Sequence, residues 1–189
     1  QIEGSDFNDM ACELGLDAVK RVFSSSQSLI EIIQVDEYDG TEPEWFIKGV
    51  LPKEKMVLTF GPSGHMKSFL TLDIMLHLAC GLDWCGHRVK QQEPVLYLCG
   101  EGASGIRRRV QAWKEHHNID YPVPFFMTKA PVALLEKEQT NMLIGAIQDF
   151  MLVTGLNRYP QIIVIDTLNR NFGAGDENST KDMTAYIES

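Results

Sequence analysis

The chain has 189 residues, of which 44% are hydrophobic and 23% are charged, and its formal net charge is −9. This length suffices for one α/β domain with its own core and a modest extension, but it leaves little room for a second full domain. The apolar runs are too short to span a bilayer, and the N-terminus lacks the apolar core of a secretion signal. The negative charge argues against a surface that binds nucleic acid everywhere, although a local basic patch or channel is compatible with it.

Cysteine usage indicates the compartment. The four cysteines form no C-x-x-C pair and are too sparse for a disulfide scaffold. This pattern fits a reducing cytosol, so we expect a cytoplasmic protein. Cys80 and Cys85 lie near His77 and His87 in the sequence, but the spacing of these four residues matches no zinc module. We therefore expect structural roles for them.

The first 44 residues divide into two segments. Residues 6–23 carry apolar side chains at helical spacing and predict a short amphipathic helix, which a serine cluster ends. Residues 24–44 are polar and acidic, with one mostly apolar stretch, and we interpret them as a linker. The main domain is therefore expected over residues 45–189, after an N-terminal segment, 1–23, and the linker.

The stretch 56–69, MVLTFGPSGHMKSF, predicts a phosphate-binding loop. Residues 56–60 form an apolar run expected to be a buried strand, residues 61–65 form the loop, and an apolar helix is expected from Lys67 to about Ala79. Small loop residues let backbone N–H groups surround phosphate oxygens, and the N-terminus of a helix adds partial positive charge. The order of strand, loop and helix is the one that this motif requires.

Within this loop the expected nucleotide contacts are Gly61, Pro62, Ser63, Gly64, His65, Met66, Lys67, Ser68 and Phe69. Lys67 is expected to reach the outer phosphates of ATP, and the Ser68 hydroxyl to ligate Mg²⁺. The usual pattern, GxxxxGKS, has glycine where this chain has Met66. We expect the loop to tolerate Met66 only if its backbone avoids positive φ, which glycine alone adopts cheaply. The alternative is an ordinary turn that happens to carry Gly, Lys and Ser.

Two carboxylates follow predicted strands. Residues 94–99 form a fully apolar strand, and Glu101 follows it between two glycines, where α/β folds place their ligands. Glu101 is therefore a candidate general base, with a helix-capping or solvated loop residue as the alternative. A second apolar strand, 162–165, ends in Asp166, as in a Walker B strand whose carboxylate emerges beside Mg²⁺. The alternative for Asp166 is a simple acid at the end of a strand.

A further helix is expected over residues 104–117, with Ile106, Val110 and Trp113 as its buried stripe. The consecutive Arg107, Arg108 and Arg109 fan round this helix, so they cannot all face one ligand, and we expect most of them to be solvated or to contact another subunit. The other expected elements are a strand at 124–128, a helix at 136–156, a loop at 167–178, and a final helix after a capping box at Ser179 and Asp182.

Together these elements predict an α/β P-loop NTPase with a mainly parallel sheet flanked by helices. The candidate base and the Walker B acid lie on different strands, and this arrangement resembles the RecA-like class. In AAA+ proteins the two acids are adjacent, whereas Thr167 follows Asp166 in this chain. The sheet is expected to lack the strands that usually complete it, because the chain stops soon after Asp166.

Three stretches, GPSGHMKSF, PVLYLCGEGASGIRRRVQAW and IIVIDTLNRNFGAGDENSTKDM, resemble the RepA-like hexameric replicative helicases of plasmids and phages. The similarity runs from about Trp45 to the end. It implies that Lys67, Ser68, Glu101 and Asp166 serve as phosphate lysine, Mg²⁺ ligand, catalytic base and Walker B acid. It also implies an ATP-hydrolysing motor that forms a hexameric ring on DNA, with the sensor strand, DNA-binding loops and arginine finger beyond Ser189.

The N-terminal segment carries a shorter resemblance. DFND at Asp6–Asp9 and GLDAVK at Gly15–Lys20 resemble the closing segment of TOPRIM-type primase domains in primase-helicase proteins. None of that family's metal-binding carboxylates is present in these residues. The resemblance implies a neighbouring primase domain in cis, and not a primase activity of this chain.

Two other functions remain open from the sequence. One is a recombination-type RecA-like ATPase that forms filaments instead of rings. The other is a nucleotide-gated module that loads DNA or a primase without translocating. Glu101 argues against the second, because a pure sensor needs no positioned base.

Overall fold

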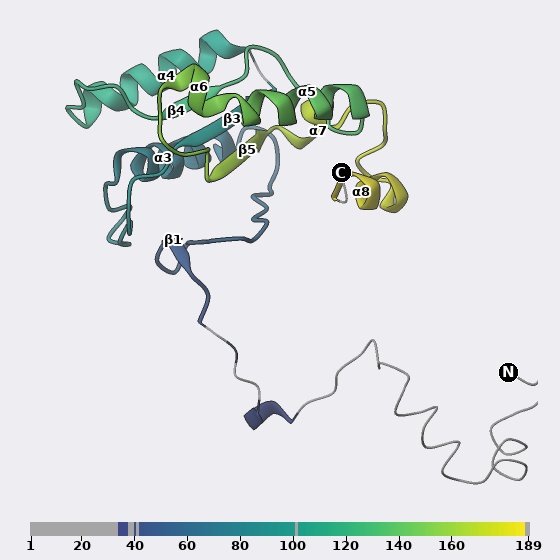
Figure 1. Ribbon diagram of the computed structural model, residues 1–189, viewed down its shortest axis with the longest axis horizontal. Coiled ribbons are helices and arrows are strands. Elements are labelled where there is room, and N and C mark those ends of the chain that lie inside the picture. The colour runs from purple at the N-terminus through teal and green to yellow at the C-terminus, as the bar shows by residue number, and fades with distance from the viewer. Residues whose placement is uncertain (1–33, 38–39, 41, 101, 188–189) are drawn as a thin grey trace, which may run out of the picture. The chain divides into compact units, whose positions relative to one another are not determined.

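The computed structural model describes residues 34–37, 40, 42–100 and 102–187 of the chain (Figure 1). The chain divides into two compact units, Gln1–Glu42 and Pro43–Ser189. In the first unit the described element is a short 3-10 helix, η1 (Val35–Glu37). The helix expected over residues 6–23, and with it the primase-like stretch, lies outside the described residues.

A parallel three-stranded sheet lies at the centre of the second unit. Its strands are β4 (Phe125–Met127), β3 (Val95–Cys99) and β5 (Ile162–Asp166), in that order across the sheet. Every residue of β3 is buried, because a central parallel strand is covered on both faces and therefore needs a continuous apolar sequence. All three strands were predicted, and the α/β class is confirmed.

A second, two-stranded antiparallel sheet joins β1 (Trp45–Ile47) to β2 (Leu51–Pro52). Phe46, Ile47 and Leu51 are buried and pack into the same hydrophobic cluster as β3. The β1–β2 pair is therefore fixed to the core by its own apolar side chains.

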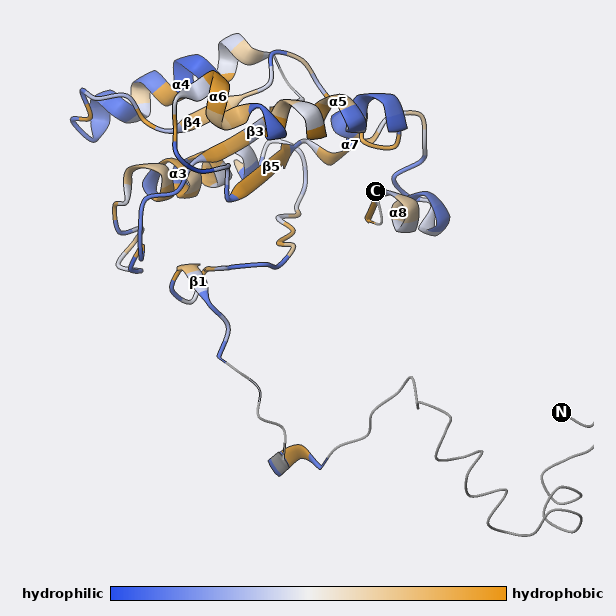
Figure 2. Cartoon of the chain, viewed as in Figure 1, coloured by the Kyte–Doolittle hydropathy of each residue, from blue (hydrophilic) through white to orange (hydrophobic). Residues whose placement is uncertain are grey.

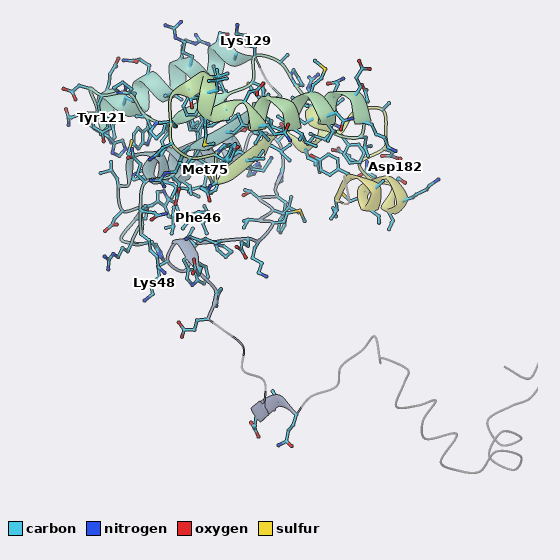
Figure 3. All side chains as sticks on the ribbon, viewed as in Figure 1. Phe46, Lys48, Met75, Tyr121, Lys129 and Asp182 are labelled. Atoms are coloured by element: carbon cyan, nitrogen blue, oxygen red, sulfur yellow. The ribbon has the colours of Figure 1, made fainter. Side chains whose placement is uncertain are left out.

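The helices described in this unit are α3 (Lys67–Cys80), α4 (Ala103–His116), α5 (Lys137–Gln148), α6 (Phe150–Thr154), α7 (Leu168–Phe172) and α8 (Thr180–Ile187). Apolar residues are concentrated in α3 and in the central strands, whereas α4 is largely polar (Figure 2). Met75 of α3 lies among packed side chains, and Lys48 and Lys129 lie at the periphery (Figure 3). None of the helices in the described ranges is both long enough and apolar enough to cross a membrane.

The buried strand expected at residues 56–60 is not formed. These residues have no assigned secondary structure, and Met56 and Phe60 are 75% and 86% exposed. A strand requires a hydrogen-bonded neighbour, and none of the described strands pairs with this segment. β5 lies at an edge of the sheet, and its Ile163 and Ile165 are exposed as well. The prediction was wrong because an apolar run alone does not supply a pairing partner.

Two other boundaries differ from the prediction. The helix expected at 136–156 is divided into α5 and α6 at Asp149, whose ψ of −4° departs from the helical value. The loop expected at 167–178 contains α7, which is held by two fully or nearly buried residues, Asn171 and Phe172. Asn171 accepts a hydrogen bond from the backbone N–H of Val132 through its side-chain oxygen. A tertiary contact therefore orders a sequence whose glycines and asparagines are typical of loops.

Candidate nucleotide-binding site

The phosphate loop leads directly into α3, as predicted. Residues from Ser63 to Phe69 line a cavity of about 240 Å³, together with Arg109 of α4 and Thr167 after β5. The loop, the first turn of α3, α4 and the end of β5 therefore meet at one place. Of the expected nucleotide contacts, only Gly61 and Pro62 do not line this cavity, and both contact the lysine of the loop.

Lys67 is folded back onto the loop. Its Nζ donates hydrogen bonds to the carbonyl oxygens of Gly61 at 2.8 Å and Pro62 at 2.9 Å. The loop therefore surrounds an ammonium group at the N-terminus of α3, where the helix dipole already favours an anion. Phosphate oxygens carry more negative charge than carbonyl oxygens, so they can replace these two acceptors.

Ser68 and Asp166 meet across the site. The Ser68 Oγ donates a hydrogen bond to Asp166 Oδ1 at 3.0 Å, and both side chains are half-buried. A hydroxyl and a carboxylate are hard oxygen donors of the kind that Mg²⁺ takes together with nucleotide phosphates. The two residues predicted as metal ligands therefore lie together and fit this ion.

Asp166 has a second partner, which the sequence did not reveal. The Tyr97 hydroxyl donates a hydrogen bond to Asp166 Oδ2. Tyr97 lies opposite Val164 in the sheet register, so its side chain shares a face with Asp166, two residues further along β5. Burial, and then the hydrogen bond and charge of Asp166, raise the pKa of Tyr97 well above its usual value. Tyr97 thus remains a donor that orients the carboxylate. In the sequence, the only sign of this contact was a tyrosine within an otherwise apolar strand.

Gly100 brings the ends of β3 and β5 together. Its N–H donates to the Asp166 carbonyl at 2.6 Å. A Cβ at this position would lie 2.6 Å from the Cβ of Arg170 and 2.8 Å from the Asp166 carbonyl oxygen, so only glycine fits without a shift of its neighbours. The candidate base Glu101 is the next residue in the sequence, but it lies outside the described residues. Its expected role is therefore not tested by this geometry.

Met66 corrects one expectation. Its φ is 60° and its ψ is 17°, which places this residue in the left-handed region that we expected it to avoid. The loop imposes this conformation on whichever residue precedes Lys67, and glycine is the usual occupant for that reason. The Met66 side chain is 68% exposed, so packing does little to offset the backbone strain.

The three consecutive arginines point in different directions, as predicted. Arg109 lines the loop cavity, and its guanidinium carbon lies 4.4 Å from the centre of the Phe69 ring. Such a distance is typical of a cation–π contact. Arg107 and Arg108 are exposed and line other cavities. The sequence predicted that few of the three would face one site, but it did not indicate which one.

Comparison with known proteins agrees with this geometry. The family described as an AAA domain matches residues 28–189, which is most of the chain. No curated protein and no solved structure matches. The loop around Lys67, the Ser68–Asp166 contact and this match lead to one conclusion: the chain belongs to the AAA domain family and is an ATPase module of the P-loop class.

Proposed function

We propose that this P-loop ATPase is the motor domain of a replicative DNA helicase, in which ATP hydrolysis drives unwinding. The observation that carries the proposal is the contact between Ser68, at the start of α3, and Asp166, at the end of β5. It supports a magnesium-nucleotide site at the ends of parallel strands, where α/β proteins bind ligands. The three stretches that resemble RepA-like helicases contain both residues and the end of β3.

The loop and the residues around it have distinct roles in this proposal. Backbone N–H groups of the loop and the N-terminus of α3 hold the phosphates. Lys67 exchanges its two carbonyl acceptors for oxygens of the outer phosphates. Ser68 and Asp166 would hold Mg²⁺, which would supply positive charge to neutralise the phosphates. Tyr97 keeps the Asp166 carboxylate directed toward Ser68.

Glu101 completes the chemistry as the residue that orients or deprotonates the attacking water. The sequence places it directly after Gly100, whose N–H is bonded to the Asp166 carbonyl. A base that follows β3 and a metal ligand that ends β5 come from neighbouring strands, since Cys99 is opposite Asp166 in the register. This separation is the RecA-like arrangement on which the resemblance depends.

The resemblance to RepA-like helicases also suggests the partners of this chain, which are further subunits and DNA. We propose a homo-oligomeric ring, most simply a hexamer, in which ATP binds between subunits and a neighbouring subunit provides the arginine finger. DNA is the substrate of the ring, and the net charge of −9 requires that it be held by a local basic surface. Residues 45–189 form the motor, residues 24–44 a linker, and residues 1–23 the end of a primase domain in cis.

The test measures phosphate release with Mg²⁺ and ATP, with and without single-stranded DNA, together with strand displacement on a forked duplex. Lys67→Ala is expected to abolish hydrolysis, whereas Lys181→Ala, an exposed lysine of α8, keeps it. Glu101→Gln retains the size of the side chain but cannot accept a proton. It is expected to bind ATP while turnover falls roughly 10²- to 10⁴-fold.

The possible results of these assays test the nucleotide site and the helicase activity separately. Unchanged turnover in a folded Lys67→Ala variant would overturn the nucleotide site itself. Hydrolysis that DNA stimulates, without strand displacement and with filaments on DNA, would favour a recombination-type ATPase. Hydrolysis that DNA does not affect, again without strand displacement, would leave the ATPase in place and overturn the helicase.

A further inference from the structure

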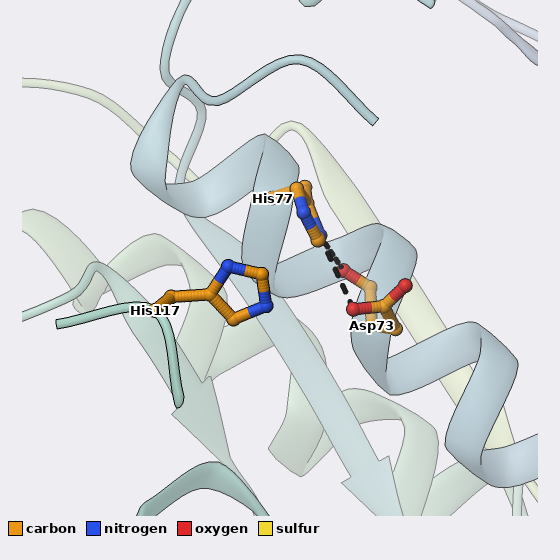
Figure 4. Close-up of side chains that lie close together, drawn as sticks. All are labelled: Asp73, His77 and His117. Carbon is orange, nitrogen blue, oxygen red and sulfur yellow. Dashed lines mark hydrogen bonds and ion pairs between the residues drawn. The ribbon is translucent and has the colours of Figure 1, made fainter. Parts of the chain in front are cut away.

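A second group of ligand-type side chains lies further along α3, outside the phosphate loop. Asp73 and His77 belong to α3, and His117 directly follows α4 (Figure 4). One ligand atom from each of these three residues can be chosen so that all three lie within 4.8 Å of one another. This cluster, Asp73–His77–His117, plays no part in the nucleotide site proposed above.

The two α3 residues are spaced i, i+4 and therefore share one face of the helix. The Nδ1 of His77 lies 2.8 Å from the backbone oxygen of Asp73 and 3.3 Å from Asp73 Oδ1. Both neighbouring atoms are acceptors, so the His77 ring is held beside the Asp73 carboxylate. A cation that binds here would take the place of this contact between the ring nitrogen and the carboxylate.

Other groups hold the ligand side chains in place. Trp84 Nε1 donates to Asp73 Oδ2 at 2.8 Å, and Trp113 Nε1 donates to Asp73 Oδ1 at 2.7 Å. The His117 ring stacks on Trp113, with ring centres 4.1 Å apart and an angle of 26° between their planes. Hydrogen bonds that orient a carboxylate and contacts that fix an imidazole are what metal sites use around their direct ligands.

The cluster is open to solvent. Asp73, His77 and His117 all line a cavity of about 910 Å³ between α3 and α4, and Cys85 and His116 line it as well. An ion therefore has a route of entry, and water or one of the two other side chains can fill a remaining coordination position. A site with three protein ligands and one open position is common for zinc.

We propose that Asp73, His77 and His117 bind a divalent transition-metal ion, with zinc as the best match. Two imidazoles and one carboxylate are typical ligands for such an ion. Ligand atoms roughly 2.0–2.2 Å from a tetrahedral ion lie about 3.3–3.6 Å from one another, and the Nδ1–Oδ1 distance of 3.3 Å is at the short end of this range. A small inward movement of His117 completes the set. The ion then links the end of α4 to α3, the helix that carries the phosphate loop.

Calorimetric titration of the chain with zinc tests the proposal, in excess Mg²⁺ and without nucleotide. We expect one zinc ion per chain, with a dissociation constant in the micromolar range or below. His77→Gln and His117→Gln should each weaken binding at least tenfold. The matched control is His87→Gln, because His87 is exposed and its Nδ1 contacts the Lys48 carbonyl outside the cluster. This variant should bind zinc like the original chain.

A second measurement does not depend on how well the variants fold. Cobalt(II) added to the unmodified chain should give the visible absorption bands of a tetrahedral nitrogen and oxygen site, and zinc should displace it. Asp73→Asn is not the primary variant, because the indoles of Trp84 and Trp113 both donate hydrogen bonds to this carboxylate. The proposal is overturned if the unmodified chain shows no saturable zinc binding at about 100 µM, or if a folded His117→Gln variant binds zinc as tightly as the His87→Gln control.

Discussion

The hydroxyl of Ser68 and the carboxylate of Asp166 are 98 positions apart in the sequence and 3.0 Å apart in space. This contact joins the first turn of α3 to the carboxyl end of β5. It therefore brings the phosphate loop and the candidate metal ligand into one site. Because the loop and the carboxylate come from different elements, substitutions can test their proposed roles separately.

Asp166→Asn is expected to weaken ATP binding in the presence of Mg²⁺ by at least about tenfold. The amide keeps the size of the side chain but loses the charge that holds the ion. Binding without Mg²⁺ should persist, because Lys67 and the loop remain. Titration of ATP with and without Mg²⁺ measures both, and Asp120→Asn, an exposed aspartate, is the control. Equal losses under the two conditions would show that the substitution distorts the loop instead.

Met66→Gly is expected to stabilise the chain, because glycine adopts the φ of 60° at this position without strain. The left-handed conformation costs a residue with a Cβ about 1–2 kcal/mol, and the greater freedom of glycine in the unfolded chain offsets part of that. We expect a net gain of roughly 0.5–1 kcal/mol in the free energy of unfolding, measured by urea denaturation. Met56→Gly is the control, since Met56 is similarly exposed but is not among the residues with positive φ. A similar gain there would refute this explanation.

The parts of the fold that the sequence predicted well are those set by local pattern. β3 and the first four residues of β5 are continuous apolar runs, α3 is a mainly apolar stretch that follows the loop, and α4 has apolar residues at helical spacing. The pairing of Ser68 with Asp166 was expected because Ser68 opens the helix after the phosphate loop and Asp166 ends a Walker B-like strand, so that both were predicted as Mg²⁺ ligands.

The parts that it missed depend on contacts between distant residues. Residues 56–60 have a strand-like sequence but no partner among the described strands, so pattern alone was misleading. Met66 has positive φ because the loop requires it, against the preference of its own side chain. Tyr97 acquires its role only through the register of β3 with β5, which the sequence does not specify.

Gly100→Ala is expected to lower the free energy of unfolding by roughly 1–3 kcal/mol, because its methyl group would overlap the Asp166 carbonyl and the Arg170 side chain. Urea denaturation measures the loss. Gly105→Ala is the matched control: Gly105 lies in α4, with nothing within 4 Å of an added Cβ, and alanine favours a helix by about 0.5–1 kcal/mol. If both substitutions changed the free energy of unfolding in the same direction, the close approach of β3 to β5 would not be what requires glycine at position 100.

Tyr97→Phe is expected to reveal a dependence on alkaline pH. Because the pKa of Tyr97 is raised in the folded chain, its proton is retained there but is lost from the unfolded chain near pH 10. The contribution of the hydroxyl to stability is therefore complete below pH 10 and falls as the pH rises above it. We expect the unmodified chain to be more stable than Tyr97→Phe by about 1 kcal/mol at pH 8, and this advantage should shrink by pH 11. Urea denaturation measures this difference in stability. A difference that stays constant from about pH 8 to pH 11 would contradict a raised pKa for Tyr97.

Glu93 and Arg158 form an ion pair near the start of β3, in which the carboxylate is buried and the guanidinium is half-exposed. Glu93 is 1% exposed, its Oε2 lies 2.9 Å from Arg158 Nη1, and its Oε1 accepts a hydrogen bond from Gln91. Arg158→Met keeps an unbranched apolar stem but leaves the carboxylate buried without its counter-ion. Removing one member of a buried pair costs more than the pair contributes, because the remaining charge is neither solvated nor compensated.

We expect Arg158→Met to lower the free energy of unfolding by roughly 1–3 kcal/mol, less than for a fully buried pair because Arg158 is itself half-exposed. Arg88→Met, which removes an exposed arginine, should change it by less than about 0.5 kcal/mol. Adding Glu93→Gln to Arg158→Met should recover part of the loss, since it removes the uncompensated charge. Urea denaturation of the two single variants, the double variant and the Arg88 control measures this coupling. If the two residues act independently, Glu93→Gln will lower the free energy of unfolding by the same amount in the Arg158→Met chain as in the unmodified chain. That result would show that burial of Glu93 does not depend on its arginine.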